Sequence, residues 1–342
     1  MNIENYVSKD KKFEFRDFWQ KVTYFKYFHE ITIFIGLLII GLVISILTPS
    51  FLTVSNIFII LQQVSITTIV AFGSAMIIIS GGIDLSVGTI IVFLGLPLAK
   101  IVLAGDGAPL YIALAILVSL LAGAFIGFIN GVNVVFLRIP AFIATLAMMQ
   151  VGRGLVLTLT GGSPIFGLPM SLVKIGIGFV GKVPVPVIIM AAVFVIVTYM
   201  MERTSLGRII YSIGLNEKGT MLAGINVKKI KLLVYTIGGL CVGLGSIIYT
   251  ARFGSVQPSS ATTTAPLMFN AIAAAILGGV ALSGGTGTML GVLIGSIIIG
   301  VVTNGLALLN VNPHARTIIL GVIVLISILV SSLSSKRDLG KK

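Results

Sequence analysis

Long apolar segments separated by short polar or charged stretches dominate the pattern of this chain. A helix needs about 20 consecutive apolar residues to cross the hydrocarbon core of a bilayer, with a range of about 17–25. Ten segments meet or approach that length, and the pattern predicts that they are transmembrane helices. They are residues 31–47, 57–79, 87–103, 110–129, 141–159, 185–201, 230–250, 267–282, 289–309 and 317–333. The segment 267–282 is short for a full crossing, so a tilted helix and a half-helix packed inside protein are both open.

Composition agrees with a bilayer environment. Hydrophobic residues make up 57% of the 342 residues and charged residues 10%, with a mean hydropathy of +1.14. Soluble domains carry about 25% charged residues, so a soluble fold could not cover this much apolar surface. The sequence predicts an all-α polytopic membrane protein with about ten transmembrane helices.

The net charge of +13 is explained by membrane orientation rather than by nucleic acid, because the basic residues lie beside the apolar segments. Ten crossings that start from a cytoplasmic N-terminus place most of the 23 basic residues on the cytoplasmic side, as the positive-inside rule requires. The exceptions are Lys100, Arg153, Lys174, Lys182, Arg252 and Arg316. Both termini are therefore predicted to be cytoplasmic; eight or twelve crossings would also satisfy the rule.

Three regions follow from this count. Residues 1–30 form a cytoplasmic amphipathic segment, which either lies on the inner membrane surface or packs on a partner subunit. Its apolar residues recur at helical spacing: Phe15, Phe18, Trp19, Val22, Phe25 and Phe28. Residues 31–335 form the transmembrane domain, with a cytoplasmic loop at 202–231, and residues 336–342 form a basic cytoplasmic tail.

An internal echo predicts two related halves. Residues 79–88 read ISGGIDLSVG and residues 276–285 read ILGGVALSGG, and an Asn-Gly pair follows each of them, at 130–131 and 304–305. We count five crossings between Asp84 and its counterpart Ala281, and an odd number predicts opposite orientations. The hypothesis is an inverted repeat, an arrangement typical of transporters whose substrate path runs between the halves.

Glycines at four-residue spacing predict close helix packing, because small residues let helix backbones approach. Packing within one chain and a seam between two copies are both compatible with the pattern. The glycines concerned are Gly123, Gly127, Gly131, Gly239, Gly243, Gly291 and Gly295.

Polar side chains within the apolar segments are candidates for a translocation path. Asp84 is one of two acidic residues between Glu30 and Glu202. It either lines a polar path, since intramembrane ionisable groups are costly, or it or Ser86 caps the third span after Gly81 and Gly82 end the second. The amides either bind a hydroxyl-rich solute or join helices. The candidate set is Gln62, Gln63, Asp84, Ser86, Asn130, Gln150, Asn270 and Asn304.

The basic loop 202–231 is long for a compact connection. It is either a docking element for a cytosolic partner or an ordinary cytoplasmic loop. Within it, residues 212–222 predict a short amphipathic helix that ends at Gly224.

The chain contains few of the residues that metal sites and nucleophilic catalysis require. The chain has one cysteine, Cys241, and two histidines, His29 and His314, which leaves little material for metal sites or nucleophilic catalysis. GIGFVG at 176–181 matches a dinucleotide-binding pattern but has no strand before it. No G-x-x-x-x-G-K-[ST] phosphate loop occurs, so any ATP hydrolysis would take place on another polypeptide.

Four strings resemble the ribose-type permeases of bacterial ATP-binding-cassette importers. They are SGGIDLSVG, RIPAFIATLAMM, TSLGRIIYSIGLNEKGTMLAGINVKKIK and NAIAAAILGGVALSGGTGT, within a similarity over roughly residues 30–333. The resemblance implies a bacterial inner-membrane permease, not an enzyme and without a cofactor, that moves a monosaccharide by alternating access. It also implies a cytosolic ATP-binding subunit, an extracytoplasmic sugar-binding protein and a second permease copy as partners. The loop around Asn216, Glu217 and Gly224 resembles the family's coupling segment.

One departure leaves the solute open. Many relatives carry an acidic pair just before the AIAA string, where this chain has Leu267, Met268, Phe269 and Asn270. A related sugar, a polyol or autoinducer-2 are therefore alternatives to ribose. The residues themselves also admit an ion-coupled secondary transporter, an intramembrane enzyme or a passive channel, although Asp84 and Arg153 are a thin supply for an ionisable relay.

Overall fold

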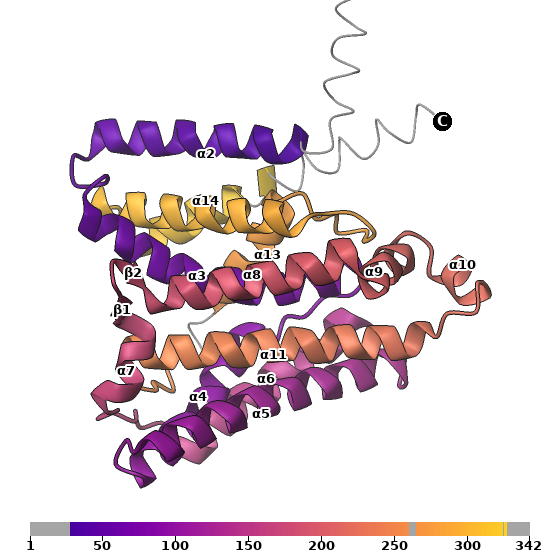
Figure 1. The fold of residues 1–342 in the computed structure, drawn as a ribbon, viewed down its shortest axis with the longest axis horizontal. Helices are drawn as coiled ribbons and strands as arrows, with labels where there is room; N and C mark the ends of the chain where they lie inside the picture. The colour runs from indigo at the N-terminus through magenta and orange to yellow at the C-terminus, as the bar shows by residue number, and fades with distance from the viewer. Residues whose placement is uncertain (1–27, 260–264, 324, 327–342) are drawn as a thin grey trace, which may run out of the picture.

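The computed structural model describes residues 28–259, 265–323, 325 and 326, and within them the chain is a bundle of long helices with one small hairpin (Figure 1). The helices of the first half are α2 (Phe28–Leu47), α3 (Val54–Ile79), α4 (Val87–Ala104), α5 (Pro109–Val135) and α6 (Ala141–Thr160). A connecting region follows, with α7 (Met170–Ile177), strands β1 (Phe179–Val180) and β2 (Val183–Pro184), and α8 (Val185–Arg203). The remaining elements are α9 (Ser205–Leu215), α10 (Glu217–Leu222), α11 (Val227–Phe253), α13 (Ala265–Leu277) and α14 (Met289–Leu308). Residues 313–323 are also helical.

Eight helices of the described residues are long and apolar enough to cross a membrane: α2, α3, α4, α5, α6, α8, α11 and α14. Each coincides with one predicted span, which confirms the all-α polytopic class. The predicted span 317–333 lies partly outside the described residues. So do most of the amphipathic segment at 1–30 and all of the tail at 336–342.

The predicted span 267–282 is a shorter helix than expected. Helix α13 has 13 residues and ends at Leu277, where Gly279 takes a φ of 87° that other residues avoid. Residues 271–276 are buried, and α13 packs against α3 and α14. The half-helix alternative is therefore the one that the structure adopts, and of the irregular backbone that follows it Gly278, Val280, Gly284 and Gly285 are buried.

The bundle has two ends that differ in content (Figure 1). We call the end that carries α9 and α10 the α9 end, and the end that carries α7 and the hairpin the α7 end. Helix α3 starts at the α7 end, where the side-chain amides of Asn56 and Asn304 are hydrogen-bonded. It finishes at the α9 end, where the N–H of Gly285 donates to the carbonyl of Ile79.

The orientation that we inferred from the sequence echo is wrong. Six segments, α4, α5, α6, α8, α11 and α13, connect Asp84 to Ala281, and an even number returns the chain to the same end. The hydrogen bond between Gly285 and Ile79 places both echo motifs together at the α9 end. The two motifs therefore have the same orientation and do not support an inverted repeat.

Opposite orientation is nevertheless present in a different pairing of helices. Helix α3 packs against α11, α13 and α14, and α11 packs against α3, α4 and α5. Contacts of Gly73 with Gly238 and of Val70 with Gly245 show that α3 and α11 run antiparallel. Element by element, α3, α4 and α5 run opposite to α11, α13 and α14 (Figure 1). The Asn-Gly pairs follow this pairing, because Asn130 is on α5 and Asn304 on α14.

The spaced glycines pack helices within one chain, as the first alternative predicted. Gly127 faces Gly239 across the α5–α11 contact, with a β-carbon built on Gly127 lying 2.9 Å from the Cα of Gly239. Gly123 and Gly243 meet in the same way one turn along. Gly291 and Gly295 of α14 pack against the end of α13. A side chain at these glycines would push the helix backbones apart.

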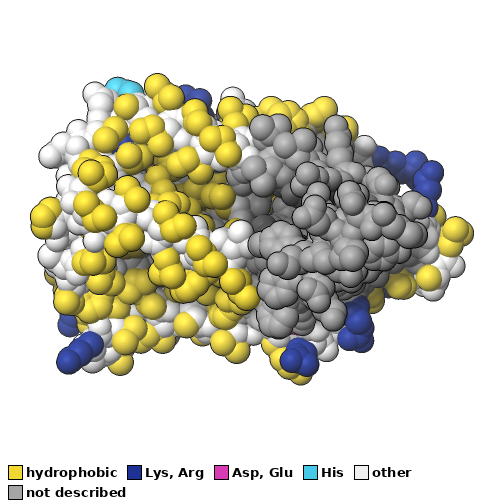
Figure 2. Space-filling view, turned by 90° about the horizontal axis from the view of Figure 1, so that it is seen from above, with side chains coloured by type: hydrophobic (Ala, Val, Ile, Leu, Met, Phe, Trp, Pro, Cys, Tyr) yellow, Lys and Arg dark blue, Asp and Glu magenta, His cyan; other side chains and the backbone are white. Residues whose placement is uncertain are grey.

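Apolar side chains both fill the centre and cover the outside. Helix α3 is buried continuously from Val64 to Ile79, whereas the helices at the margin expose large apolar residues, among them Leu42, Leu121 and Ile196. On the face shown in Figure 2, hydrophobic side chains predominate outside the grey region and Lys and Arg lie at the edges. This distribution fits a bundle surrounded by lipid.

Candidate functional site

The segment between α8 and α11 forms two short helices rather than the single helix predicted at 212–222. Helix α9 ends at Leu215 because Asn216 is extended, with φ −156° and ψ 93°. The side-chain oxygen of Asn216 then accepts the N–H of Gly219 at 2.8 Å and caps α10. An Asn at this position competes with the helical hydrogen bonds and favours a new start. The correction gives Asn216 a structural role that the amphipathic pattern did not show.

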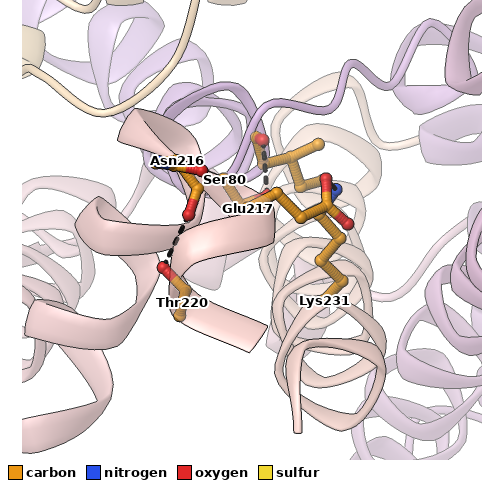
Figure 3. A network of polar contacts seen from close by, with 6 residues as sticks. Ser80, Asn216, Glu217, Thr220 and Lys231 are labelled. Atoms are coloured by element: carbon orange, nitrogen blue, oxygen red, sulfur yellow. Dashed lines mark hydrogen bonds and ion pairs between the residues drawn. The ribbon is translucent and has the colours of Figure 1, made fainter. Parts of the chain in front are cut away.

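Of the other two predicted coupling residues, Glu217 begins α10 and Gly224 follows its end. Glu217 accepts a hydrogen bond from the ammonium of Lys231 at 2.6 Å, which ties α10 to the first turns of α11 (Figure 3). Gly224 has a φ of 83° and follows the helix, as a C-terminal glycine should. All three residues therefore shape the same short projection at the α9 end.

This projection presents an apolar tip surrounded by basic residues. Leu222 is 85% exposed and Leu215 69% exposed, and Met221 lies between them on α10. Arg208, Lys218 and Lys228 are also exposed. Exposed apolar side chains at the end of a bundle, with basic residues around them, form a surface of the kind that contacts proteins or membranes.

Asp84, Ser86 and Asn130 form one buried polar cluster that joins the α3–α4 linker to α5. The carboxylate of Asp84 accepts the N–H of Ser86 at 2.8 Å and its hydroxyl at 2.6 Å. The side-chain amide of Asn130 donates to the Ser86 hydroxyl oxygen at 3.0 Å and to Asp84 at 3.4 Å. All three side chains are buried. The cluster fixes the linker in place, whether or not it also meets a solute.

The capping interpretation of Asp84 and Ser86 is wrong for the helical N–H groups of α4. Ser86 is the N-cap residue of α4, but its side chain makes no capping hydrogen bond. Asp84 binds the N–H of Ser86 itself, one residue before the helix starts. The prediction that the glycines end α3 is confirmed: the helix stops at Ile79, and Gly81 has a φ of 81°.

Asn304 belongs to a second buried pair, which the sequence did not indicate. Its amide donates to the Asn56 oxygen at 2.8 Å and accepts from the Asn56 amide at 2.9 Å. Asn56 also donates to the carbonyl of Phe51. This reciprocal pair joins the start of α3 to the end of α14 at the α7 end.

The remaining path candidates are spread over three helices. Gln62 and Gln63 on α3 and Asn270 on α13 are half-buried, and these two helices pack against each other. Gln150 lies apart on α6, which packs against α4 and α5, and its side chain is exposed near the middle of the helix. The eight candidates therefore do not form one site. Asp84, Ser86 and Asn130 form one buried cluster and Asn304 belongs to another, while Gln62, Gln63, Asn270 and Gln150 lie outside both.

Comparisons with known proteins agree with this architecture. The model of a family described as branched-chain amino acid transport system / permease component matches residues 56–328. The chain belongs to this permease family. It is 42% identical to the ribose import permease protein RbsC of Escherichia coli K12 over 87% of this chain and 92% of that protein. It is 39% identical to RbsC of Bacillus subtilis, over 87% and 91%. It is 34% identical to the D-allose transport system permease protein AlsC of Escherichia coli K12, over 98% of both chains. No solved structure matches the chain.

The α7 end of the permease carries a second exposed surface. Helix α7 is anchored by the buried Leu172 and by Gly176, which lies against the backbone of Arg252. Phe166, Met170 and Val180 are more than 60% exposed, with Lys174 and Lys182 nearby in the chain. This surface contains most of the loop 160–184, at the end of the permease opposite to α10.

Sequence reasoning missed residues whose roles depend on distant partners. Thr145 of α6 accepts the N–H of Leu85 at 3.1 Å, and Tyr211 of α9 donates to the carbonyl of Gly287 at 2.7 Å. Glu30 accepts the Thr288 hydroxyl at 2.6 Å, which joins α2 to the start of α14. Of these residues only Thr145 lies within a predicted span, and a polar residue in an apolar segment does not name its partner; Glu30 precedes the first span and Tyr211 lies in the loop 202–231.

Proposed function

We propose that this permease is the membrane-spanning subunit of an ATP-binding-cassette importer that moves a monosaccharide or a closely related polar solute. The observation that carries the proposal is the capped α9–α10 projection, a rigid partner-binding surface at one end of a bundle without a phosphate loop in its sequence. The relatives named for ribose, D-allose and galactose/methyl galactoside support a sugar as the solute.

The positive-inside rule assigns the α9 end to the cytoplasm. This end carries Arg208, Lys218, Lys228, Lys229 and Lys231 on or beside its short helices. Basic residues of short loops are retained on the cytoplasmic side. The α10 projection then faces a cytosolic ATPase subunit, with Asn216, Glu217 and Gly224 holding its shape. The surface of α7 and the hairpin faces an extracytoplasmic solute-binding protein.

A second copy of the permease is part of this proposal. Gln150 and Arg153 are both exposed on α6, within the apolar span. A charged side chain facing lipid at the centre of a helix costs about 2.5–3.5 kcal/mol on insertion scales. This polar face of α6 is therefore better placed against a second copy and the aqueous path between the two than against lipid.

In this mechanism, no bond in the solute is made or broken. ATP-driven closure of the cytosolic subunits moves α10 and α9, and the helices of the two opposed halves shift so that the path opens to the other side. Gln62, Gln63, Asn270 and Gln150 are the proposed polar contacts along the path, while the buried Asp84 and Asn304 clusters hold the helices that carry them.

Transport by purified components tests the proposal. The permease is reconstituted in liposomes with its ATPase subunit and binding protein, and uptake of labelled ribose, D-allose and galactose is measured with and without ATP. Uptake of one sugar that requires both partners and ATP is expected. Uptake by the permease alone, driven by a sodium or proton gradient, would instead identify an ion-coupled carrier.

A further inference from the structure

Helix α9 rests on the two echo motifs, and this contact uses backbone rather than side chains. The buried face of α9 ends at Gly214, and a β-carbon built there would overlap the carbonyl oxygen of Ile79 and lie 2.9 Å from the Cα of Gly285. From the other side, a β-carbon built on Gly284 would lie 3.1 Å from the Ile79 carbonyl oxygen and 3.2 Å from the Cα of Gly214. At Gly214 three segments of the chain thus converge backbone to backbone, while the side chain of Leu215 packs against Gly285.

Two hydrogen bonds fix this convergence. The N–H of Gly285 donates to the Ile79 carbonyl at 2.9 Å and joins the linker after α13 to the end of α3. The hydroxyl of Tyr211, three residues before Gly214, donates to the carbonyl of Gly287 at 2.7 Å. Burial and the nearby carboxylate of Glu202 raise the pKa of Tyr211 to about 12, so its hydroxyl keeps this proton at physiological pH.

We infer that Ile79, Gly81, Gly284, Gly285 and Gly287, which we call the α9 seat, transmit movement of α9 to both halves of the permease at once. One part of the seat belongs to the α3–α4 linker and the other to the α13–α14 linker. The inference rests on the proposed function. It adds the place at which movement of α9 passes to the α3–α4 linker and to the α13–α14 linker.

Glycine is the residue that such a contact requires. Gly81, Gly284, Gly285 and Gly287 all have positive φ values, which shape the two linkers around α9. At Gly214 the contact is made between backbones, so no side chain can change rotamer there and absorb the displacement, and packed backbones transmit strain. The two motifs meet α9 at positions that the echo does not equate: Ile79 begins ISGGIDLSVG, whereas Gly284 and Gly285 end ILGGVALSGG.

Two substitutions test the α9 seat. Gly214→Ala adds a methyl group between α9 and both linkers, and Tyr211→Phe removes one hydrogen bond with little change in shape. The matched controls are Gly36→Ala on α2, where a β-carbon meets nothing within 4 Å, and Tyr199→Phe on α8, whose ring is 65% exposed.

The measurement is the amount of sugar taken up per ATP hydrolysed by the reconstituted complex, with the ratio of permease to ATPase subunit recorded for each variant. We expect the coupling ratio to fall about tenfold for Gly214→Ala, equivalent to about 1.4 kcal/mol. We expect a fall of about two- to tenfold for Tyr211→Phe, the range for one lost hydrogen bond. Both controls keep the wild-type ratio, and all four variants keep the ATPase subunit.

A merely structural role of the seat would lower the amount of complex and leave the uptake per ATP unchanged, and that result overturns the inference. If Gly214→Ala does not assemble, Tyr211→Phe decides alone, and a wild-type ratio in that variant counts against the seat. A wild-type complex that hydrolyses ATP without ATP-dependent uptake defeats the proposed function itself. The two failures are therefore distinguishable.

Discussion

Buried polar side chains in this permease join segments that are far apart in the sequence. Asn56 and Asn304 are 248 residues apart and exchange two hydrogen bonds. Asp84 and Asn130, 46 residues apart, meet through Ser86. A buried polar group without a partner loses the hydrogen bonds that water would provide, so each residue needs the other. The contribution of these side chains to the free energy of folding therefore belongs to hydrogen-bonded pairs rather than to single residues.

The Asn56–Asn304 pair gives the first prediction. Asn304→Leu leaves the side-chain oxygen of Asn56 without its donor, although the Asn56 amide nitrogen keeps the Phe51 carbonyl, and is expected to lower the free energy of unfolding by about 1–2 kcal/mol. The double variant Asn56→Leu/Asn304→Leu removes both polar groups and should recover part of that loss. Thermal unfolding in detergent of the wild type, both single variants and the double variant gives the coupling energy. Additive effects of the two substitutions would contradict the pair.

Asp84 gives the second prediction. Asp84→Asn keeps the shape but replaces one acceptor oxygen with an amide donor in a cluster that already supplies the Ser86 N–H, the Ser86 hydroxyl and the Asn130 amide. A mismatched buried donor costs about 1–3 kcal/mol, so we expect lower thermal stability and reduced uptake. Asp106→Asn, at an exposed turn of the α7 end, is the control. Unchanged stability of Asp84→Asn would show that the cluster does not hold the linker.

Sequence alone identified the polar residues but not their roles. Asp84 and Asn304 were conspicuous because polar groups are costly inside apolar spans. Their partners could not be chosen, since the 3.6-residue period places residues on a helix face but does not say which helix faces it. Asn56 lies near the start of a span, where an amide attracts no notice, and it was missed for that reason.

At the scale of elements, capping divides the connection between α8 and α11. The amphipathic pattern predicted a helix at 212–222, and the structure has a break at Asn216 within it. Helix α9 buries Gly207, Ile210 and Ile213, whereas α10 buries only Thr220 and exposes Met221 and Leu222, so the two helices do not continue one amphipathic face. The competing signal was Asn216 itself, whose side chain favours a new helix start over continued helix.

The third prediction concerns this break. Asn216→Ala removes the acceptor for the Gly219 N–H and is expected to weaken α10 by about 1 kcal/mol, the usual effect of losing an N-cap. If α10 is the contact for the ATPase subunit, its affinity for the permease should fall by about fivefold. Asn216→Asp, which also caps a helix, should restore binding. Surface plasmon resonance with the purified ATPase subunit measures both affinities. Equal affinities of Asn216→Ala and Asn216→Asp would show that the helix cap does not contribute to binding of the subunit.

The glycine seam between α5 and α11 gives the fourth prediction. Gly239→Val places a branched side chain against the Gly127 Cα, where even a β-carbon would lie 2.8 Å away. Overpacking of this kind costs about 1–3 kcal/mol, and here it also separates the two most extensive helices of the bundle. We expect loss of folded permease in size-exclusion chromatography. Gly36→Val on α2, at an open position, should elute as the wild type does.

At the scale of the whole molecule, the sequence predicted the helices and the class of protein, and it misjudged how the echo relates the halves. Helix lengths follow from bilayer thickness, so hydropathy alone located the spans. The echo was misread because Ala281 lies at the end of the sixth apolar segment after Asp84, not the fifth, so both strings reach the same end of the bundle. Both strings bear on α9 at the same end of the bundle, whereas the opposed halves are defined by whole helices, α3 to α5 against α11 to α14.

The exposed face of α6 gives the last prediction, which concerns assembly. In a homodimer with α6 at its centre, Gln150 of one copy lies close to Gln150 of the other. Gln150→Cys should then form a disulfide under mild oxidation in membranes, which doubles the apparent mass from 36.0 kDa. The native Cys241 is buried and gives little background.

Val195→Cys on α8 is the matched control, because Val195 is 63% exposed and the apolar Ile188 and Ile196 are exposed on the same helix. A lipid-facing position has no fixed neighbour, so this variant should stay at the mass of one chain. Cross-linking of Val195→Cys but not of Gln150→Cys would move the interface to α8. The exposed glutamine and arginine of α6 would then need a different polar partner, because a bilayer does not accommodate them without cost.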